Sequence, residues 1–186
     1  MAIKIIDNCC SLDYLDTLKN IAINSENWNL RYPQGRSVED KFLKLEIINN
    51  NRIKHPFLAG LAMGLLMQIY EAGGPDLFTT EIWQCGISIK DKHKRGYLHT
   101  DYEKEKDIGM IKILGILNSD WKEEWGGGFH HNGTSNYIKP TSFCVFDASE
   151  QHSAEEIFTD KKRLTIDFQV YRDLQSLEKA HKIGNK

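Results

Sequence analysis

Alternation of apolar and polar positions is the clearest pattern in the chain, and it dominates the second half. In TTEIWQCGISI (residues 79–89), one face of an extended strand would carry Ile82, Gln84, Gly86 and Ser88, and the other Trp83, Cys85, Ile87 and Ile89. IGMIKILGIL (108–117) is nearly continuously apolar, which is typical of a central strand. TSFCVFD (141–147) and KRLTIDFQVYR (162–172) predict two further strands.

The first half predicts helices between short strands. IKII (3–6) is a short apolar strand, and Ser11 then caps a helix whose apolar face would be Leu12, Leu15, Leu18 and Ala22. A second helix begins at Pro56 and runs to about Glu71, where Gly73-Gly74 would end it.

The connecting segments complete the predicted order. Residues 24–35 read as a loop, KFLKLEII (41–48) as a strand, and DLQSLEKAHKI (173–183) as an amphipathic helix or tail. Helices come first and strands dominate later, which predicts an α+β, sheet-dominated fold. We expect one domain over 1–186, with N-terminal helices (about 11–72) packed on a sheet region (about 80–171).

Composition and net charge limit which binding partners and which cellular compartment are expected. The chain has 186 residues, 40% of them apolar, and a net charge of −2, which gives no electrostatic support for nucleic acid or anionic membrane as the partner. FLAGLAMGLLMQIY (57–70) is shorter than the ~20 residues of a membrane-spanning helix. The start lacks a secretion-signal pattern, and the 4 cysteines form no CxxC pair. A reduced, cytoplasmic compartment is therefore expected.

The stretch YLHTDYEKEKD (97–107) contains the first candidate for chemistry. On extended backbone His99 and Asp101 point to one side, so both can bind one metal ion. A third ligand is offered by His152, which is 51 residues after Asp101, just past another predicted strand. Two histidines and one carboxylate form the facial triad used for non-haem Fe(II), whereas structural zinc prefers four closed ligands.

A second candidate follows in KKRLTIDF (161–168). Arg163 and Thr165 share one face of the predicted strand, and an arginine fork beside a hydroxyl suits a carboxylate. Because an unpaired buried arginine is costly, an inward Arg163 implies a buried anion. A dicarboxylate that binds the metal at one end and Arg163 at the other would meet this need. A bulge would instead turn Lys162 inward, so this alternative stays open.

These motifs, taken in order, resemble the 2-oxoglutarate- and Fe(II)-dependent oxygenases, and in particular their prolyl-4-hydroxylase-like branch. LNSDWKEEWGGGF (117–129) is similar to that branch's segment between the HxD strand and the distal histidine, and IIDNCCSLDYLDTLKNIA (5–22) to its N-terminal strand and helix. The resemblance covers most of the chain and implies a double-stranded β-helix (jelly-roll) core with iron at its mouth.

The resemblance also implies roles for single residues. His99, Asp101 and His152 would be the catalytic iron ligands, while Arg163, assisted by Thr165, would bind the distal carboxylate of 2-oxoglutarate. Where the branch often carries a second cosubstrate contact, a tyrosine before its LN pair, this chain has LGIL (114–117). Two residues are candidates for that missing contact, Lys112 and Tyr97.

The implied activity is that of a dioxygenase that hydroxylates an unactivated C–H bond, with Fe(II), 2-oxoglutarate and O2, and with ascorbate as a candidate reductant. A peptidyl proline is the first hypothesis for the substrate. A small molecule, another side chain or a nucleobase are alternatives with the same cofactors. A metal-binding jelly-roll module without turnover is the alternative of another class. Halogenation is disfavoured because Asp101 occupies the carboxylate position.

Several other residues have plainer interpretations. His130 and His131 are adjacent, so they would face opposite ways on a strand, and we expect them in a loop at the pocket rim. The basic stretch KDKHKR (90–95) is a candidate for receiving an acidic substrate, with a solvated loop as the simpler reading. YEKEKD (102–107) is a candidate flanking loop. Four residues are expected in the core: Trp121, Trp125, Cys85 and Cys144.

Overall fold

Two antiparallel sheets and three α-helices make up the computed structural model, which describes residues 3–31, 41–73, 76–101 and 109–184. The helices are α1 (Leu12–Ile23), α2 (Pro56–Gly73) and α3 (Leu174–Gly184), with a 3-10 turn, η3 (Glu123–Trp125). The strands are β1 (Lys4–Ile6), β2 (Trp28–Arg31), β3 (Phe42–Asn49), β4 (Arg52–Ile53), β5 (Ile82–Lys90), β6 (Met110–Ile116), β7 (Phe129–His131), β8 (Thr134–Asn136), β9 (Phe143–Asp147), β10 (His152–Ala154) and β11 (Arg163–Tyr171).

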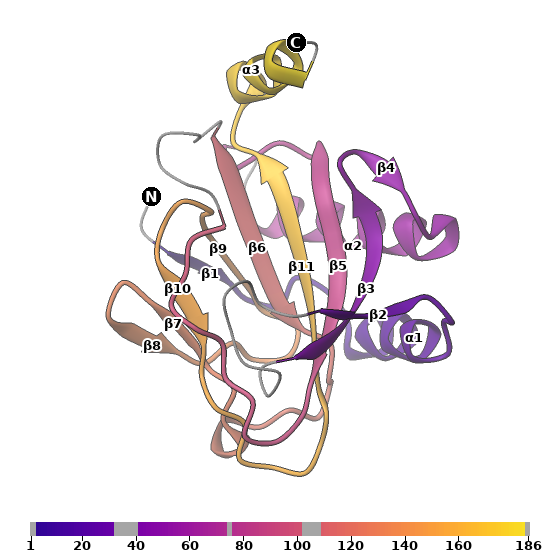
Figure 1. The fold of residues 1–186 in the computed structure, drawn as a ribbon, viewed down its shortest axis with the longest axis vertical. Helices are drawn as coiled ribbons and strands as arrows, with labels where there is room; N and C mark the ends of the chain where they lie inside the picture. Colours follow the sequence, from indigo (N-terminus) through magenta and orange to yellow (C-terminus); the bar gives the residue numbers. More distant parts are fainter. Residues whose placement is uncertain (1–2, 32–40, 74–75, 102–108, 185–186) are drawn as a thin grey trace.

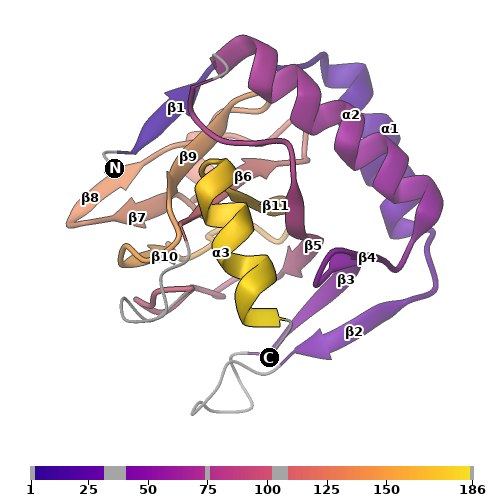
Figure 2. The same ribbon diagram turned by 90° about the horizontal axis from the view of Figure 1, so that it is seen from above.

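The large sheet has 8 strands in the order β1-β9-β6-β11-β5-β3-β2, with β4 added beside β3 (Figure 1). The small sheet has the order β10-β7-β8. Figure 2 shows α1 and α2 side by side over one face of the large sheet, with the small sheet on the other side. The predicted sheet-dominated α+β fold with supporting N-terminal helices is confirmed.

The main core lies between the large sheet and the two N-terminal helices. Ser11 caps α1 as predicted, because its hydroxyl accepts a hydrogen bond from the Tyr14 backbone N–H at 3.1 Å. The buried face of α1 is Leu15, Leu18 and Ala22. Leu12 was expected on this face but is 49% exposed, because it is the first helical residue and lies at the edge of the contact.

One predicted loop is wrong. Residues 24–35 contain β2, an edge strand that pairs with β3 through Trp28 opposite Leu45. The Trp28 indole N–H donates to the Ala22 carbonyl oxygen at 3.1 Å and so ties β2 to the end of α1. The strand has only 4 residues and is mostly exposed, so its alternating WNLR pattern was not recognised as a strand. The second helix includes Gly73, whereas its other predicted stop, Gly74, lies outside the described residues.

Strand β11 divides the inside of the molecule into two environments. All 9 of its residues are buried, but they alternate in character. The four apolar ones lie in the core under the helices, and they are Leu164, Ile166, Phe168 and Val170. The residues between them that line the cavity on the other face are Arg163, Thr165 and Asp167. A polar pocket therefore lies directly against the central strand of the sheet.

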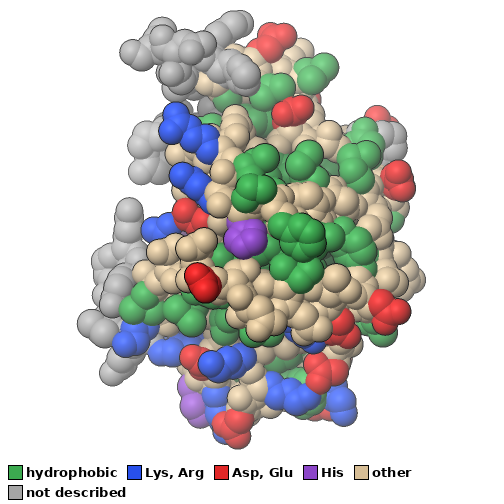
Figure 3. Space-filling model, turned by 90° about the vertical axis from the view of Figure 1, so that its right-hand side faces the viewer, with side chains coloured by type: hydrophobic (Ala, Val, Ile, Leu, Met, Phe, Trp, Pro, Cys, Tyr) green, Lys and Arg blue, Asp and Glu red, His purple; other side chains and the backbone are tan. Residues whose placement is uncertain are grey.

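Some apolar side chains on the outer surface of the helical layer are exposed to solvent. Hydrophobic side chains gather over part of the face shown in Figure 3. The large hydrophobic side chains of α2 that remain exposed are Phe57, Met63 and Met67. None of the described helices combines the length and hydropathy that crossing a bilayer requires.

Gly115 in β6 offers a test of the packing. A Cβ atom there would stand 2.3 Å from the Phe143 ring, so we expect Gly115→Ala to destabilise the fold by about 2 kcal/mol through overpacking. Gly60→Ala is the matched control, because no atom lies within 4 Å of a Cβ at this exposed position of α2. It should stabilise by up to ~1 kcal/mol. Urea unfolding measures both, and equal effects would contradict the packing described.

Candidate active site

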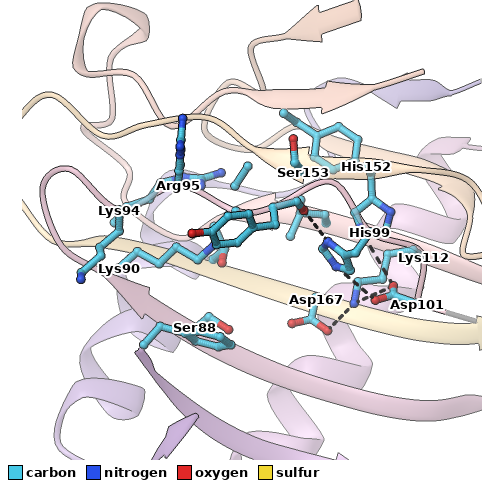
Figure 4. A pocket seen from close by; sticks show the side chains of 18 of the residues that line it. Ser88, Lys90, Lys94, Arg95, His99, Asp101, Lys112, His152, Ser153 and Asp167 are labelled. Atoms are coloured by element: carbon cyan, nitrogen blue, oxygen red, sulfur yellow. Dashed lines mark hydrogen bonds and ion pairs between the residues drawn. The ribbon is translucent and has the colours of Figure 1, made fainter. Parts of the chain in front are cut away.

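A cavity of about 490 Å³ lies on the face of the large sheet that points away from α1 and α2. Its walls come from β3, β5, β6 and β11, and its rim from the segment between β5 and β6 together with β10 (Figure 4). The volume is within the range of small-molecule pockets, roughly 300–1,000 Å³. All five predicted site residues line this cavity: His99, Asp101, His152, Arg163 and Thr165.

An antiparallel bridge brings the two predicted histidine ligands together. The His99 N–H donates to the His152 carbonyl at 3.0 Å, and the His152 N–H donates to the His99 carbonyl at 2.9 Å. From the His99 and His152 rings, Nε2 lies 3.7 and 3.8 Å from the two carboxylate oxygens of Asp101. One ligand atom from each of the three residues falls within 4.8 Å of the others. The three residues can therefore hold one metal ion.

Both imidazole rings are oriented by backbone carbonyls. The His99 Nδ1–H donates to the Tyr97 carbonyl at 2.7 Å, and the His152 Nδ1–H donates to the Glu150 carbonyl at 2.9 Å. A carbonyl oxygen only accepts, so Nδ1 must carry the proton in each ring. The Nε2 lone pairs are then free toward Asp101, which is the arrangement that metal-binding histidines show.

A buried ion-pair network holds the aspartate. Lys112 Nζ lies 3.2 Å from Asp101 Oδ2 and 3.0 Å from Asp167 Oδ1, and Lys44 Nζ lies 3.8 Å from Asp167. Burial opposes ionisation of both carboxyls, but Lys112 outweighs it, so the pKa values of Asp101 and Asp167 are lowered. Asp101 is therefore kept as a carboxylate, the form that binds metal.

An apolar wall surrounds the second histidine. The His152 ring centroid lies 4.8 Å from that of Phe146 and 5.8 Å from that of Phe129. Burial lowers the pKa of His152 to about 4, although Asp101 acts in the opposite direction. The ring is therefore neutral near pH 7, as a metal ligand must be.

The other end of the cavity carries a guanidinium. Arg163 is 2% exposed, and within the described part of the chain its Nε atom has no hydrogen-bond partner. Burial lowers the pKa of Arg163 to about 10. Lys162 is exposed, so Arg163 is the residue that turns inward. A buried cation without a partner fits an anionic ligand group, and the His-Asp-His donor set fits a divalent metal.

Several neighbouring residues differ from their predicted setting. His130 and His131 do not lie in a rim loop but in β7, where His131 is 4% exposed with Nε2 2.6 Å from Glu150 Oε2. The His131 ring is stacked on Phe129 of the same strand and meets Phe146 edge-on, and these contacts bury it. Tyr97 lines the cavity as expected. YEKEKD (102–107) lies outside the described residues.

Two charged residues of the pocket were missed from the sequence, Asp167 and Lys44. Period two was the available signal for Asp167, which follows Thr165 by two on β11. From the basic stretch KDKHKR (90–95), the residues that line the cavity are Lys90, Lys94 and Arg95. The predicted core residues behave as expected, since Trp121, Cys85 and Cys144 are buried and Trp125 packs edge-on against Trp121.

The His152 environment predicts how acid affects the metal-free protein. Its pKa of about 4 in the folded chain is below the ~6.5 of an unfolded histidine, so the unfolded chain binds more protons between these values. The free energy of unfolding should fall by on the order of 2 kcal/mol as the pH drops from about 6.5 to about 4. Urea unfolding with a chelator measures this. His152→Gln should flatten the fall, and an unchanged slope would contradict the assignment.

Comparison with known proteins places this geometry in a fold family. No family model matches the chain, and no curated protein matches its sequence. Solved structures do match: a Pseudomonas putida prolyl-4-hydroxylase has a TM-score of 0.63, 16% identity and coverage of 92% of this chain and 93% of that one.

Two further structures widen the comparison. A prolyl hydroxylase from Trichoplax adhaerens, in complex with a peptide fragment of hypoxia inducible factor, has a TM-score of 0.62 at 16% identity, covering 94% of this chain and 86% of that one. The non-haem alpha-ketoglutarate-dependent epimerase SnoN of nogalamycin biosynthesis has a TM-score of 0.67 at 11% identity, covering 91% and 78%. The chain therefore has the double-stranded β-helix fold of the 2-oxoglutarate- and Fe(II)-dependent oxygenases.

Proposed function

We propose that the protein is a 2-oxoglutarate- and Fe(II)-dependent dioxygenase that hydroxylates an unactivated C–H bond. The observation that carries this proposal is the composition of one cavity. A His-Asp-His donor set lies at one end. At the other end lies Arg163, whose buried Nε has no hydrogen-bond partner among the described residues. The similar fold of known oxygenases supports the same reading. No other described cluster of three such side chains has metal-ligand spacing.

Some residues of the cavity would bind the metal and the cosubstrate, and others would support these ligands. His99, Asp101 and His152 would hold Fe(II), with 2-oxoglutarate bound between the metal and Arg163, beside Thr165. When bound, iron and 2-oxoglutarate supply the activation of O2, which releases succinate and CO2 and places one oxygen atom on the substrate. Lys112 keeps Asp101 ionised, and Phe129 with Phe146 excludes water beside His152.

The substrate is the finer part of the proposal. A peptidyl proline is our first hypothesis, which the similarity to prolyl hydroxylases supports, one of them bound to a peptide fragment. Oxidation of a small molecule with the same cofactors is the second, which the similarity to an epimerase of nogalamycin biosynthesis supports. Either would be tested by succinate release in the presence of ascorbate, with proline-containing peptides in one arm and free small molecules in the other.

An anaerobic titration tests the cofactor site directly. Adding Fe(II) and then 2-oxoglutarate to metal-free protein should produce the visible charge-transfer band of the chelate. His99→Ala should abolish the band, because one of three protein ligands is lost. Arg163→Ala should raise the Kd for 2-oxoglutarate by about 100-fold, since a buried charge-assisted contact is removed.

Lys162→Ala is the matched control for Arg163→Ala, because Lys162 is adjacent in sequence but exposed. It should leave the Kd within about twofold, as surface charges contribute little. No band from folded wild-type protein would contradict the oxygenase proposal. Metal uptake without a 2-oxoglutarate chelate would then favour the non-catalytic metal-binding module.

A further inference from the structure

Lys90 is the cross-strand neighbour of the arginine at the far end of the cavity. In the β5–β11 ladder Lys90 lies opposite Arg163, and Ser88 lies opposite Thr165. All four residues line the cavity. Side chains directly opposite each other on one face have Cβ atoms about 5 Å apart. Figure 4 shows Lys90 on the side of the pocket away from His99 and Asp101.

The other lysines of the pocket floor have partners, and this pair of cations does not. Lys44 and Lys112 are both paired with Asp167. Among the described residues, neither Lys90 nor Arg163 has a carboxylate oxygen within ion-pair distance. The Lys90 ammonium lies over the Phe42 ring, with Nζ 5.6 Å from the ring centroid. Two adjacent cations in a partly buried site repel each other, so this arrangement is costly until an anion arrives.

Strand β6, on the other side of β11, carries apolar residues at this end of the cavity. Ile116 lies opposite Thr165 and packs with Trp121 and Ile157 in a separate apolar cluster. A polar contact from this strand is therefore missing at the carboxylate end. The neighbouring strand β5 offers Lys90 at the same end of the cavity.

We infer that Lys90 is a second positioning residue for the cosubstrate, and that its ammonium and the Arg163 guanidinium together bind the distal carboxylate of 2-oxoglutarate. This inference rests on the proposed function. The two carboxylate oxygens would be shared between the arginine fork and the ammonium, with the Thr165 hydroxyl beside them. The repulsion between the two cations would be relieved only when a carboxylate lies between them.

The pair also gives cosubstrate binding a pH dependence. Burial, together with Arg163, lowers the pKa of Lys90 to about 8, while Asp167 acts in the opposite direction. The other charged groups around this end of the cavity are Lys41 just before β3, Lys44 on β3, and Lys94 and Arg95 on the loop after β5. A bound carboxylate raises the pKa of Lys90, so affinity should be full below about pH 8 and should fall as the pH rises above it.

The test measures binding rather than turnover. The Kd for 2-oxoglutarate is obtained from the anaerobic charge-transfer band at pH 7 and pH 9, for wild type, Lys90→Met, Lys90→Arg and Lys92→Met. Lys90→Met should weaken binding about tenfold or more at pH 7 and remove the pH dependence. Lys90→Arg should restore affinity and keep it constant to pH 9, because arginine stays charged. Lys92→Met, which removes an exposed partner of Asp160, should behave as wild type.

Thermal unfolding of the metal-free variants separates positioning from structural support. Lys90→Met should melt at or above the wild-type temperature, because it removes a repulsion and breaks no ion pair. A lower Kd or an unchanged Kd in folded Lys90→Met would overturn the inference, and so would a loss of affinity explained by a lower melting temperature.

A cosubstrate analogue distinguishes this failure from failure of the proposed function. 2-Oxopentanoate keeps the metal-binding 2-oxo acid group and lacks the distal carboxylate. Its weaker band should be the same in wild type and Lys90→Met. If both compounds give a band but Lys90→Met affects neither, the oxygenase site stands and the role of Lys90 is refuted. If wild type gives no band with either compound, the proposed function itself is refuted, and the inference with it.

Discussion

The site depends on the pair of backbone hydrogen bonds that joins His99 to His152. These residues belong to segments far apart in the chain, the connection after β5 and the strand β10. The ladder continues past the bridge, since the Gly96 N–H donates to the Ala154 carbonyl and the Asp101 N–H donates to that of Ala148. Antiparallel pairing fixes the register, so both rings and the carboxylate are aimed at one point before any metal binds.

The register of strand β11 is the second constraint, because its side chains face the core on one side and the pocket on the other. Its apolar positions complete the layer beneath α1 and α2, so the strand cannot shift by one residue without exposing them. That fixed register places Arg163 and Asp167 four residues apart, about 13 Å along the strand. Asp167 is neutralised by Lys112 at the metal end, whereas Arg163 is left for a ligand. One strand thus carries Asp167, which has an ion-pair partner, and Arg163, which has none among the described residues.

Sequence patterns predicted those parts of the molecule in which local signals agree with tertiary packing. The apolar runs of β6, β9 and β11 and the cap at Ser11 were all predicted. The resemblance carried by HxD, the distal histidine and Arg-x-Thr also picked out five residues that line one cavity. The exposed edge strand β2 was missed because its alternation spans only 4 residues and follows the polar residues 24–27. The placement of His131 failed because its ring packs against Phe129 of the same strand and Phe146 of β9, a contact that depends on tertiary structure. The pairing of Lys90 with Arg163 needed the cross-strand register, which one sequence does not specify.

The WGGG segment (125–128), which carries part of the family resemblance, lies against the arginine of the pocket. Gly127 has a φ of +71°, and a Cβ there would stand 2.8 Å from Arg163 Cδ, so the guanidinium stem lies directly against bare backbone. Hydrogen bonds from Gly127 to Glu156 and from Phe158 to Trp125 hold this segment beside the strand-like residues after β10.

The Trp121 indole N–H donates to the Gly126 carbonyl at 3.0 Å and fixes the start of the turn. Arg163 therefore packs against the backbone of Gly127, and Trp121 holds the neighbouring Gly126 in place. A larger residue at Gly127 would move the arginine before it changed any metal ligand. The segment therefore supports the carboxylate end of the pocket. Gly127 is glycine because a side chain there would collide with the buried Arg163, whose charge implies an anionic ligand.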